Sequence, residues 1–220
     1  MSDADTNKSA EWIARALAAN PVKATADGTF LTCPVRLSFP NIFARSRPIP
    51  PNTEGKYGAN IVFPVGADLS LLEKAVNKAV TDKWPNAGQK GGPKIKSPWK
   101  QQADMMDRYD GYEEDGVYIS ATSDRQPPVY TPPQQLVTDP DRIYPGVWAI
   151  VQLRTFAYDK GVNKGVSFGL QDLMIVAEDK RLGGGGSSPA AYAGIQIDAD
   201  ASSDSVFGSD EDAAAAKLFS

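Results

Sequence analysis

The chain has 220 residues, 41% of them hydrophobic, with no histidine and a single cysteine, Cys33. These counts exclude a Ser-His-Asp triad, a Cys-His pair, a histidine metal cage, an internal disulfide and a cysteine zinc site. The net charge of −4 is unevenly spread, because six acidic residues and one lysine follow Leu182 and leave 22 basic and 21 acidic residues in 1–181, a net of +1.

Neither a membrane helix nor a secretion signal is visible in the sequence. No apolar run approaches the roughly 18–20 residues that a membrane helix needs. The first residues, MSDADTNKSAEW, have no basic segment followed by an apolar one. We therefore expect a soluble, cytoplasmic protein.

The first half of the chain predicts two helices and two strands. Residues 9–19 have the cap and apolar stripe of a short helix, and residues 69–84 have the spacing of an amphipathic one. Residues 28–39 and 56–65 alternate apolar and polar side chains, as half-buried strands do. Pro34 marks an edge or a bulge within the first strand, because proline cannot donate to a ladder.

The second half predicts three more strands and an unstructured end. Residues 116–123 alternate, and a proline-rich connection with a short strand near Val129 follows. Residues 147–158 give the clearest strand, which a short hairpin loop joins to its partner at 166–176. Residues 183–220 are rich in Ala, Ser, Asp and Gly and are expected to be a disordered acidic tail.

This order of elements predicts a mainly β fold, a five-stranded OB-type β-barrel with one or two peripheral helices. The expected divisions are an N-terminal extension at 1–27, the barrel domain at 28–182 and the tail at 183–220. One helix follows the second strand, although most such barrels place it after the third. A split of the first strand at Pro34 would restore the usual order.

Strand parity predicts an outward face that mixes aromatic rings with cations. If the apolar sets face the core, the opposite faces carry Phe30, Arg36, Lys56, Asn60, Tyr118, Trp148, Arg154, Phe156 and Tyr158. Single-stranded nucleic acid binds such surfaces, because bases stack on rings and the backbone follows positive charge. The alternative is that these aromatics pack under helices or cover a barrel end.

The loop before residue 100 is a second candidate for contact with phosphates. It places Lys90, Lys94, Lys96 and Lys100 among Gly and Pro residues with no acidic residue, and it contains Trp99. This composition suits a flexible flap over a phosphate chain. The alternative is an ordinary solvated loop, but an exposed tryptophan there favours a function.

The acidic stretch from Asp104 to Asp115 contains carboxylates that a Mg²⁺ site for phosphoryl chemistry would need, but a contiguous run is more typical of a solvated surface. The run GGGGSS lacks the features of a phosphate loop and is a linker.

Near the chain end, acidic residues precede an apolar pair: Asp210, Glu211, Asp212, Leu218 and Phe219. This pattern is typical of a segment that binds a basic partner, or the protein's own groove when DNA is absent; the alternative is a solubilising tail.

Three segments together resemble a family of bacteriophage single-stranded DNA-binding proteins, long catalogued as a domain of unknown function. They are VRLSFPNIF, GYEEDGVYISATSDRQPPVY and YPGVWAIVQLRTFAYDKGVNKGVSFGLQDLMIVAEDKRLGG. The resemblance runs from about Thr29 to Gly184, and LSFPN, NKGV and RLGG are its most specific parts. It implies an oligonucleotide-binding fold with an acidic tail and a role in covering single strands during phage replication and recombination. The N-terminal helix and the Ala-rich tail are additions.

We therefore expect a non-enzymatic binder of single-stranded DNA without strong sequence preference, needing no cofactor or metal, in the cytoplasm of the infected bacterial host. The predicted contacts to phosphates are Arg36, Lys56, Lys94, Lys96, Lys100, Arg154 and Lys164. The predicted stacking residues are Trp99, Tyr118, Phe156 and Tyr158. On this interpretation Leu37 and Phe39 anchor the first strand while Arg36 faces the groove. The alternatives are a phage structural β-barrel that contacts proteins and a Mg²⁺-dependent nuclease.

Overall fold

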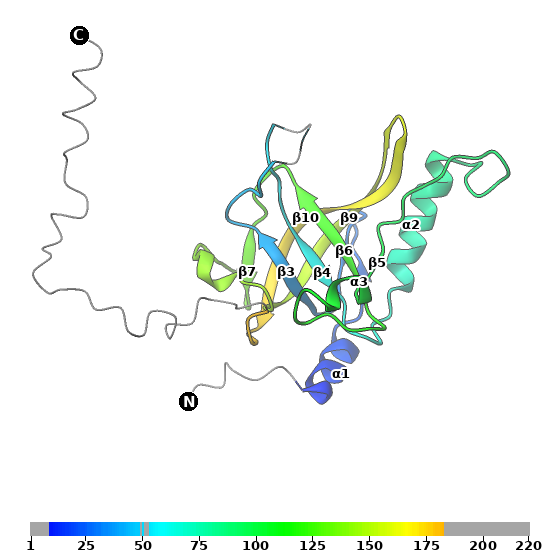
Figure 1. The fold of residues 1–220 in the computed structure, drawn as a ribbon. Helices are drawn as coiled ribbons and strands as arrows, with labels where there is room; N and C mark the ends of the chain where they lie inside the picture. Colours follow the sequence, from blue (N-terminus) through cyan, green and yellow to red (C-terminus); the bar gives the residue numbers. More distant parts are fainter. Residues whose placement is uncertain (1–8, 49, 51–52, 183–220) are drawn as a thin grey trace, which may run out of the picture. The chain divides into compact units, whose positions relative to one another are not determined.

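The computed structural model describes residues 9–48, 50 and 53–182, and its centre is a closed ring of five strands (Figure 1). In spatial order these are β9 (Trp148–Lys160), β3 (Val35–Asn41), β4 (Tyr57–Val62), β6 (Val117–Ser123) and β10 (Asn163–Ala177), which pairs again with β9. Within this ring only the β6–β10 pairing is parallel. The ring contains the five strands predicted from the alternation, so the mainly β fold class is confirmed.

Shorter elements surround the ring: α1 (Ala10–Ala19), β1 (Lys23–Ala24), β2 (Phe30–Leu31), α2 (Ser70–Lys83), β5 (Lys100–Gln101), α3 (Ala103–Met106), β7 (Val129–Thr131), β8 (Gln135–Leu136) and the 3-10 turn η2 (Pro140–Arg142). Strands β1 and β2 extend the sheet beside β9, and β7 and β8 extend it beside β10. The β9–β10 hairpin projects beyond the ring (Figure 1). None of the described helices is long and apolar enough to cross a membrane.

The core fills the inside of the ring. Five of its fully buried side chains, one from each ring strand, are Leu37, Ile61, Ile119, Leu153 and Phe168. Helix α2 packs on β9 and β10 and adds Leu72 and Val76 to the same cluster. The helical spacing predicted this amphipathic packing, and burying such a stripe supplies most of the stability of a surface helix.

The first predicted strand is interrupted near Pro34, as expected, but the interruption does not change the order of the ring. Its two parts, β2 and β3, both pair with β9, through Phe30 opposite Leu153 and Val35 opposite Ala149. The split therefore adds no further side to the ring. Helix α2 still follows the second ring strand, so the prediction that a split restores the usual order is wrong.

Phe39 was expected in the core and is instead 43% exposed. Ser38 pairs with Asn60 and Asn41 pairs with Gly58, so two residues of β3 lie opposite one residue of β4. Such a β-bulge reverses the alternation of side chains. Phe39 adopts a φ of +49°, an uncommon conformation for a bulky residue. The bulge therefore turns this ring away from the core.

Candidate nucleic-acid interface

Three of the predicted contact residues lie along the outer face of β9. Leu153 and Ala157 belong to the core side of this strand, so Arg154, Phe156 and Tyr158 point outward. The Phe156 ring is 43% exposed and the Arg154 side chain is 53% exposed. This hairpin strand therefore presents a cation and two rings along one line.

The neighbouring strand β10 places only small residues beside these side chains. Gly165 lies opposite Tyr158, and Ser167 lies opposite Phe156. A Cβ atom on Gly165 would lie 2.5 Å from the Tyr158 hydroxyl oxygen, so the tyrosine ring crosses the strand at the glycine. Because no large side chain competes for this space, the rings can lie over β10 and keep a face open for stacking.

A strip of small polar residues continues this surface onto β6 and β4. The parallel register of β10 and β6 pairs Phe168 with Ala121, which places Ser167 and Ser120 side by side on the outer face. The Ser120 hydroxyl donates to the Asn60 side-chain oxygen over 2.7 Å, and Lys100 Nζ donates to Ser120 Oγ over 2.9 Å. In five-stranded oligonucleotide-binding barrels, the second and third strands form the binding face, and here these are β4 and β6.

The loop between β3 and β4 adds cations and a ring at one end of β4. The Arg45 guanidinium lies 5.2 Å from the Tyr57 ring centre and donates to the carbonyl oxygens of Gly55 and Asp124. Lys56, a predicted contact, forms an exposed ion pair of 3.1 Å with Asp124. Loops in this position contribute to binding in the same class of barrel.

The sequence missed a second pair of exposed rings. Phe39 and Tyr109 are 43% and 41% exposed and meet edge to face with centroids 4.8 Å apart. No sequence pattern reveals the bulge that exposes Phe39, because side chains alternate between the two faces only where the strand pairing is uninterrupted. Arg45 was missed because a loop has no alternation to interpret. Tyr57, the first residue of β4, was missed because the alternation of 56–65 places it on the core side.

Two outward-facing aromatics are covered, so the prediction that they are open is wrong. Tyr118 is 6% exposed, because Tyr112 packs edge to face on it at 5.5 Å and Lys100 lies 5.4 Å from its ring centre. Burial is the main cause that raises the pKa of Tyr118. Trp148 is 2% exposed, and Trp12 of α1 packs against it at 5.1 Å.

Arg36 faces away from the core but not into an open groove, and this expectation too is wrong. Its side chain is 12% exposed and lies 3.7 Å from the Asp179 carboxylate. It also donates to the carbonyl oxygens of Gly146 and Lys180 and stacks over Trp148 at 5.8 Å. Burial lowers the pKa of Arg36, and the charge of Asp179 opposes that shift. In this structure Arg36 fastens the segment after β10 to the ring.

The expected lysine flap is attached to the ring rather than free. Lys96 accepts from the Val166 amide and donates its own amide to the Lys164 carbonyl, and its ammonium group donates to Asn163 Oδ1 over 2.7 Å. The Lys164 ammonium group donates a hydrogen bond to the Asp159 carboxylate, and this bond is the main reason that the pKa of Asp159 is lowered. Lys94 is exposed.

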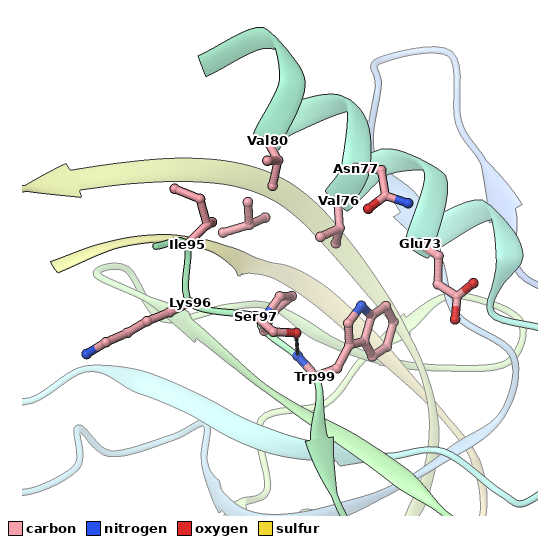
Figure 2. A pocket seen from close by; sticks show the side chains of 10 residues that line it. Glu73, Val76, Asn77, Val80, Ile95, Lys96, Ser97 and Trp99 are labelled. Atoms are coloured by element: carbon pink, nitrogen blue, oxygen red, sulfur yellow. Dashed lines mark hydrogen bonds between the residues drawn. The ribbon is translucent and has the colours of Figure 1, made fainter. Parts of the chain in front are cut away.

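Trp99 was expected to be exposed and instead faces inward from this attached segment. Its ring lies between Phe63 and Phe168, with centroid distances of 6.2 Å and 5.9 Å. The indole lines a cavity of about 340 Å³, and Figure 2 shows Val76 and Asn77 of α2 at the same cavity. Trp99 therefore packs against the core and does not present a free ring.

The acidic stretch from Asp104 to Asp115 is held in place by the buried side chain of Gln102. The buried Gln102 side chain donates to the carbonyl oxygens of Phe63 and Val117 and accepts from the Glu113 amide, which fixes the ends of the stretch. Among residues 9–48, 50 and 53–182, no three His, Cys, Asp or Glu side chains gather closely enough to hold a metal ion. The five predicted tail residues lie beyond residue 182, outside the described part of the chain.

The comparisons with known proteins show the family of the chain and its fold. The family model described as Enterobacter phage Enc34, ssDNA-binding protein, matches residues 28–205. The single-stranded DNA-binding protein from bacteriophage Enc34, solved in complex with ssDNA, superposes with a TM-score of 0.60 at 16% identity, covering 82% of this chain and 99% of its own. The T7 protein gp2.5, a single-stranded DNA-binding protein, gives 0.53 at 13% identity, with 71% and 95% covered. No curated protein matches the chain.

Proposed function

The chain belongs to the family of phage single-stranded DNA-binding proteins represented by the Enc34 protein, and we propose that it holds single-stranded DNA on the outer face of β4, β6, β9 and β10. The observation that carries this site is the line of Arg154, Phe156 and Tyr158 beside the small residues of β10. Rings supply stacking to any base and cations supply attraction to phosphates, so the binding needs no sequence preference.

The polar strip gives the site a floor beside the rings of the hairpin. Asn60 and Ser120 lie next to each other on β4 and β6, and Ser167 of β10 lies between Ser120 and Phe156. Small polar side chains leave room for a sugar-phosphate chain and can donate to it. We place Lys100 at this floor as a phosphate contact, with Lys56 at one end and Lys96 and Lys164 near the hairpin.

The family supports the role that we propose, which is to cover single strands during phage replication and recombination in the cytoplasm of the infected host. We propose that the chain has no catalytic activity. We also propose that the acidic tail, with Leu218 and Phe219, binds a replication or recombination protein. The phage structural barrel is a weaker candidate, because the family match spans residues 28–205.

Binding can be measured by fluorescence anisotropy of a labelled oligothymidine titrated with the full chain at several salt concentrations. A labelled strand is preferable to tryptophan quenching, because Trp84 and Trp148 are buried and Trp99 faces inward. We expect saturable binding that weakens as salt rises, since cations that contact phosphates displace counterions. Absence of binding at low salt would favour the structural barrel.

A further inference from the structure

The tip of the β9–β10 hairpin exposes an apolar side chain. Val162 is 98% exposed and lies between two exposed residues, Lys160 and Asn163. The tip is braced, because Asn163 accepts a hydrogen bond from Lys96 and Lys164 bonds Asp159. A braced loop loses little conformational entropy when it binds, so this tip is well suited to insertion into a pocket.

A cavity of about 310 Å³ lies at the other end of the same two strands. Its apolar lining comes from Leu31 of β2, Ile150 of β9 and Met174 of β10. Asp172, Gln134 and Lys23 add polar groups at its wall, and the charge of Asp27 also acts on Asp172. The cavity therefore combines an apolar floor with a carboxylate, which favours a guest that is apolar at its end and cationic beside it.

The carboxylate of Asp172 forms no ion pair with Lys23, which lines the same cavity. It is half-buried, and no residue of the described part of the chain forms a hydrogen bond or ion pair with it. Burial raises the pKa of Asp172, and the charge of Asp27 raises it further. Removing water from a carboxylate without an ion pair costs free energy, so a cation that reaches Asp172 in this cavity would be stabilised.

We propose that the hairpin tip of one copy of this chain inserts into this cavity of the next copy, with Val162 on the apolar floor and Lys160 beside Asp172. Both surfaces are complementary in polarity and charge. From Ile150 to Lys160 the strand spans about 33 Å at roughly 3.3 Å per residue, so tip and cavity are distinct patches at opposite ends. Contacts between distinct patches repeat head to tail.

The contact would align the proposed DNA-binding faces. Arg154 and Phe156 lie on β9 between the cavity residue Ile150 and the tip, so copies joined head to tail place these side chains in series. A single hairpin tip covers a small area, so the contact is weak in free solution and forms where DNA holds neighbours together. This consequence rests on the proposed function, whereas the contact between copies does not.

Charge exchange tests the contact in the full-length chain. We compare the affinity for long polythymidine with the affinity for an oligothymidine that holds one copy. Lys160→Asp and Asp172→Lys should each lower this ratio by about tenfold, because each places two like charges together at the contact. The double variant should recover the ratio, and thermal unfolding checks that each variant folds. A double variant no better than the singles would overturn the proposal.

The apolar half of the contact has a matched control. Val162→Asp should lower the same ratio by about tenfold, because an aspartate cannot enter an apolar cavity beside Asp172. Val65→Asp adds the same charge at a residue that is 46% exposed in the loop after β4, and it should leave the ratio unchanged. Equal ratios for the two variants would contradict the insertion of Val162.

Oxidative cross-linking separates this proposal from the proposed function, because it needs no DNA. A full chain with Val162→Cys and Gln134→Cys, at high concentration and also on polythymidine, should give a ladder longer than dimers. The control with Val65→Cys and Gln134→Cys should not, and the native Cys33 is 2% exposed and stays out of the reaction. No ladder in either condition would overturn the head-to-tail contact even if single-site DNA binding is intact.

Discussion

The Phe156→Ala variant is expected to separate DNA binding from folding. The ring is 43% exposed, and a Cβ on Gly169 would lie 3.8 Å from it, so the ring rests on β10 without filling the core. Losing this half-buried surface costs about 1–2 kcal/mol of folding stability. Losing one stacked base costs about 1–3 kcal/mol of binding free energy, a decrease in affinity of roughly 5- to 150-fold.

Anisotropy titrations of a one-site oligothymidine at matched salt measure this decrease, and thermal unfolding gives the stability. Val65→Ala is the matched control, because it removes an apolar side chain of similar exposure from a loop outside the proposed face. It should leave the affinity unchanged. Equal affinities of the native chain and the Phe156 variant, with both folded, would refute the stacking role of this ring.

Three further outcomes follow from the contacts described above. Arg36→Ala should lower the free energy of unfolding by about 3–5 kcal/mol in a denaturant titration, because it removes a cation beside the buried Asp179 carboxylate together with its hydrogen bonds to Gly146 and Lys180; an unchanged midpoint would show that these contacts are not structural. Arg154→Ala should lower the slope of log affinity against log salt by about one, and an unchanged slope would remove it from the phosphate contacts. The Cys33 thiol, whose pKa burial raises to about 12, should react with a thiol reagent at pH 8 only as the chain unfolds, and fast reaction of the folded protein would contradict its burial.

Alternation predicted the ring strands and one side of the site well. Strand β9 is long and regular, so its parity placed Arg154, Phe156 and Tyr158 outward, as the structure shows. Parity states which side of the sheet a residue occupies, but it does not state what covers that side. Tyr118 and Trp148 therefore point outward as predicted and are nevertheless buried under a second layer.

Features that depend on long-range pairing were not predictable from the sequence. The lysine-rich loop has the composition of a free flap, but its backbone bonds to Lys164 and Val166 fix it beside β10 and turn Trp99 inward. The bulge at Phe39 depends on the register with β4, which alternation in β3 alone does not determine. In both cases residues distant in the sequence decide which side chains are exposed.

Photochemical cross-linking tests the central claim most directly. A one-site oligonucleotide containing 5-bromouracil is irradiated with the full chain, and mass spectrometry identifies the residues that form adducts. We predict adducts at Phe156 or Tyr158 on the outer face of β9, because their rings stack on the bases. Adducts confined to rings outside this face, such as Tyr130 of β7, would contradict the proposed site.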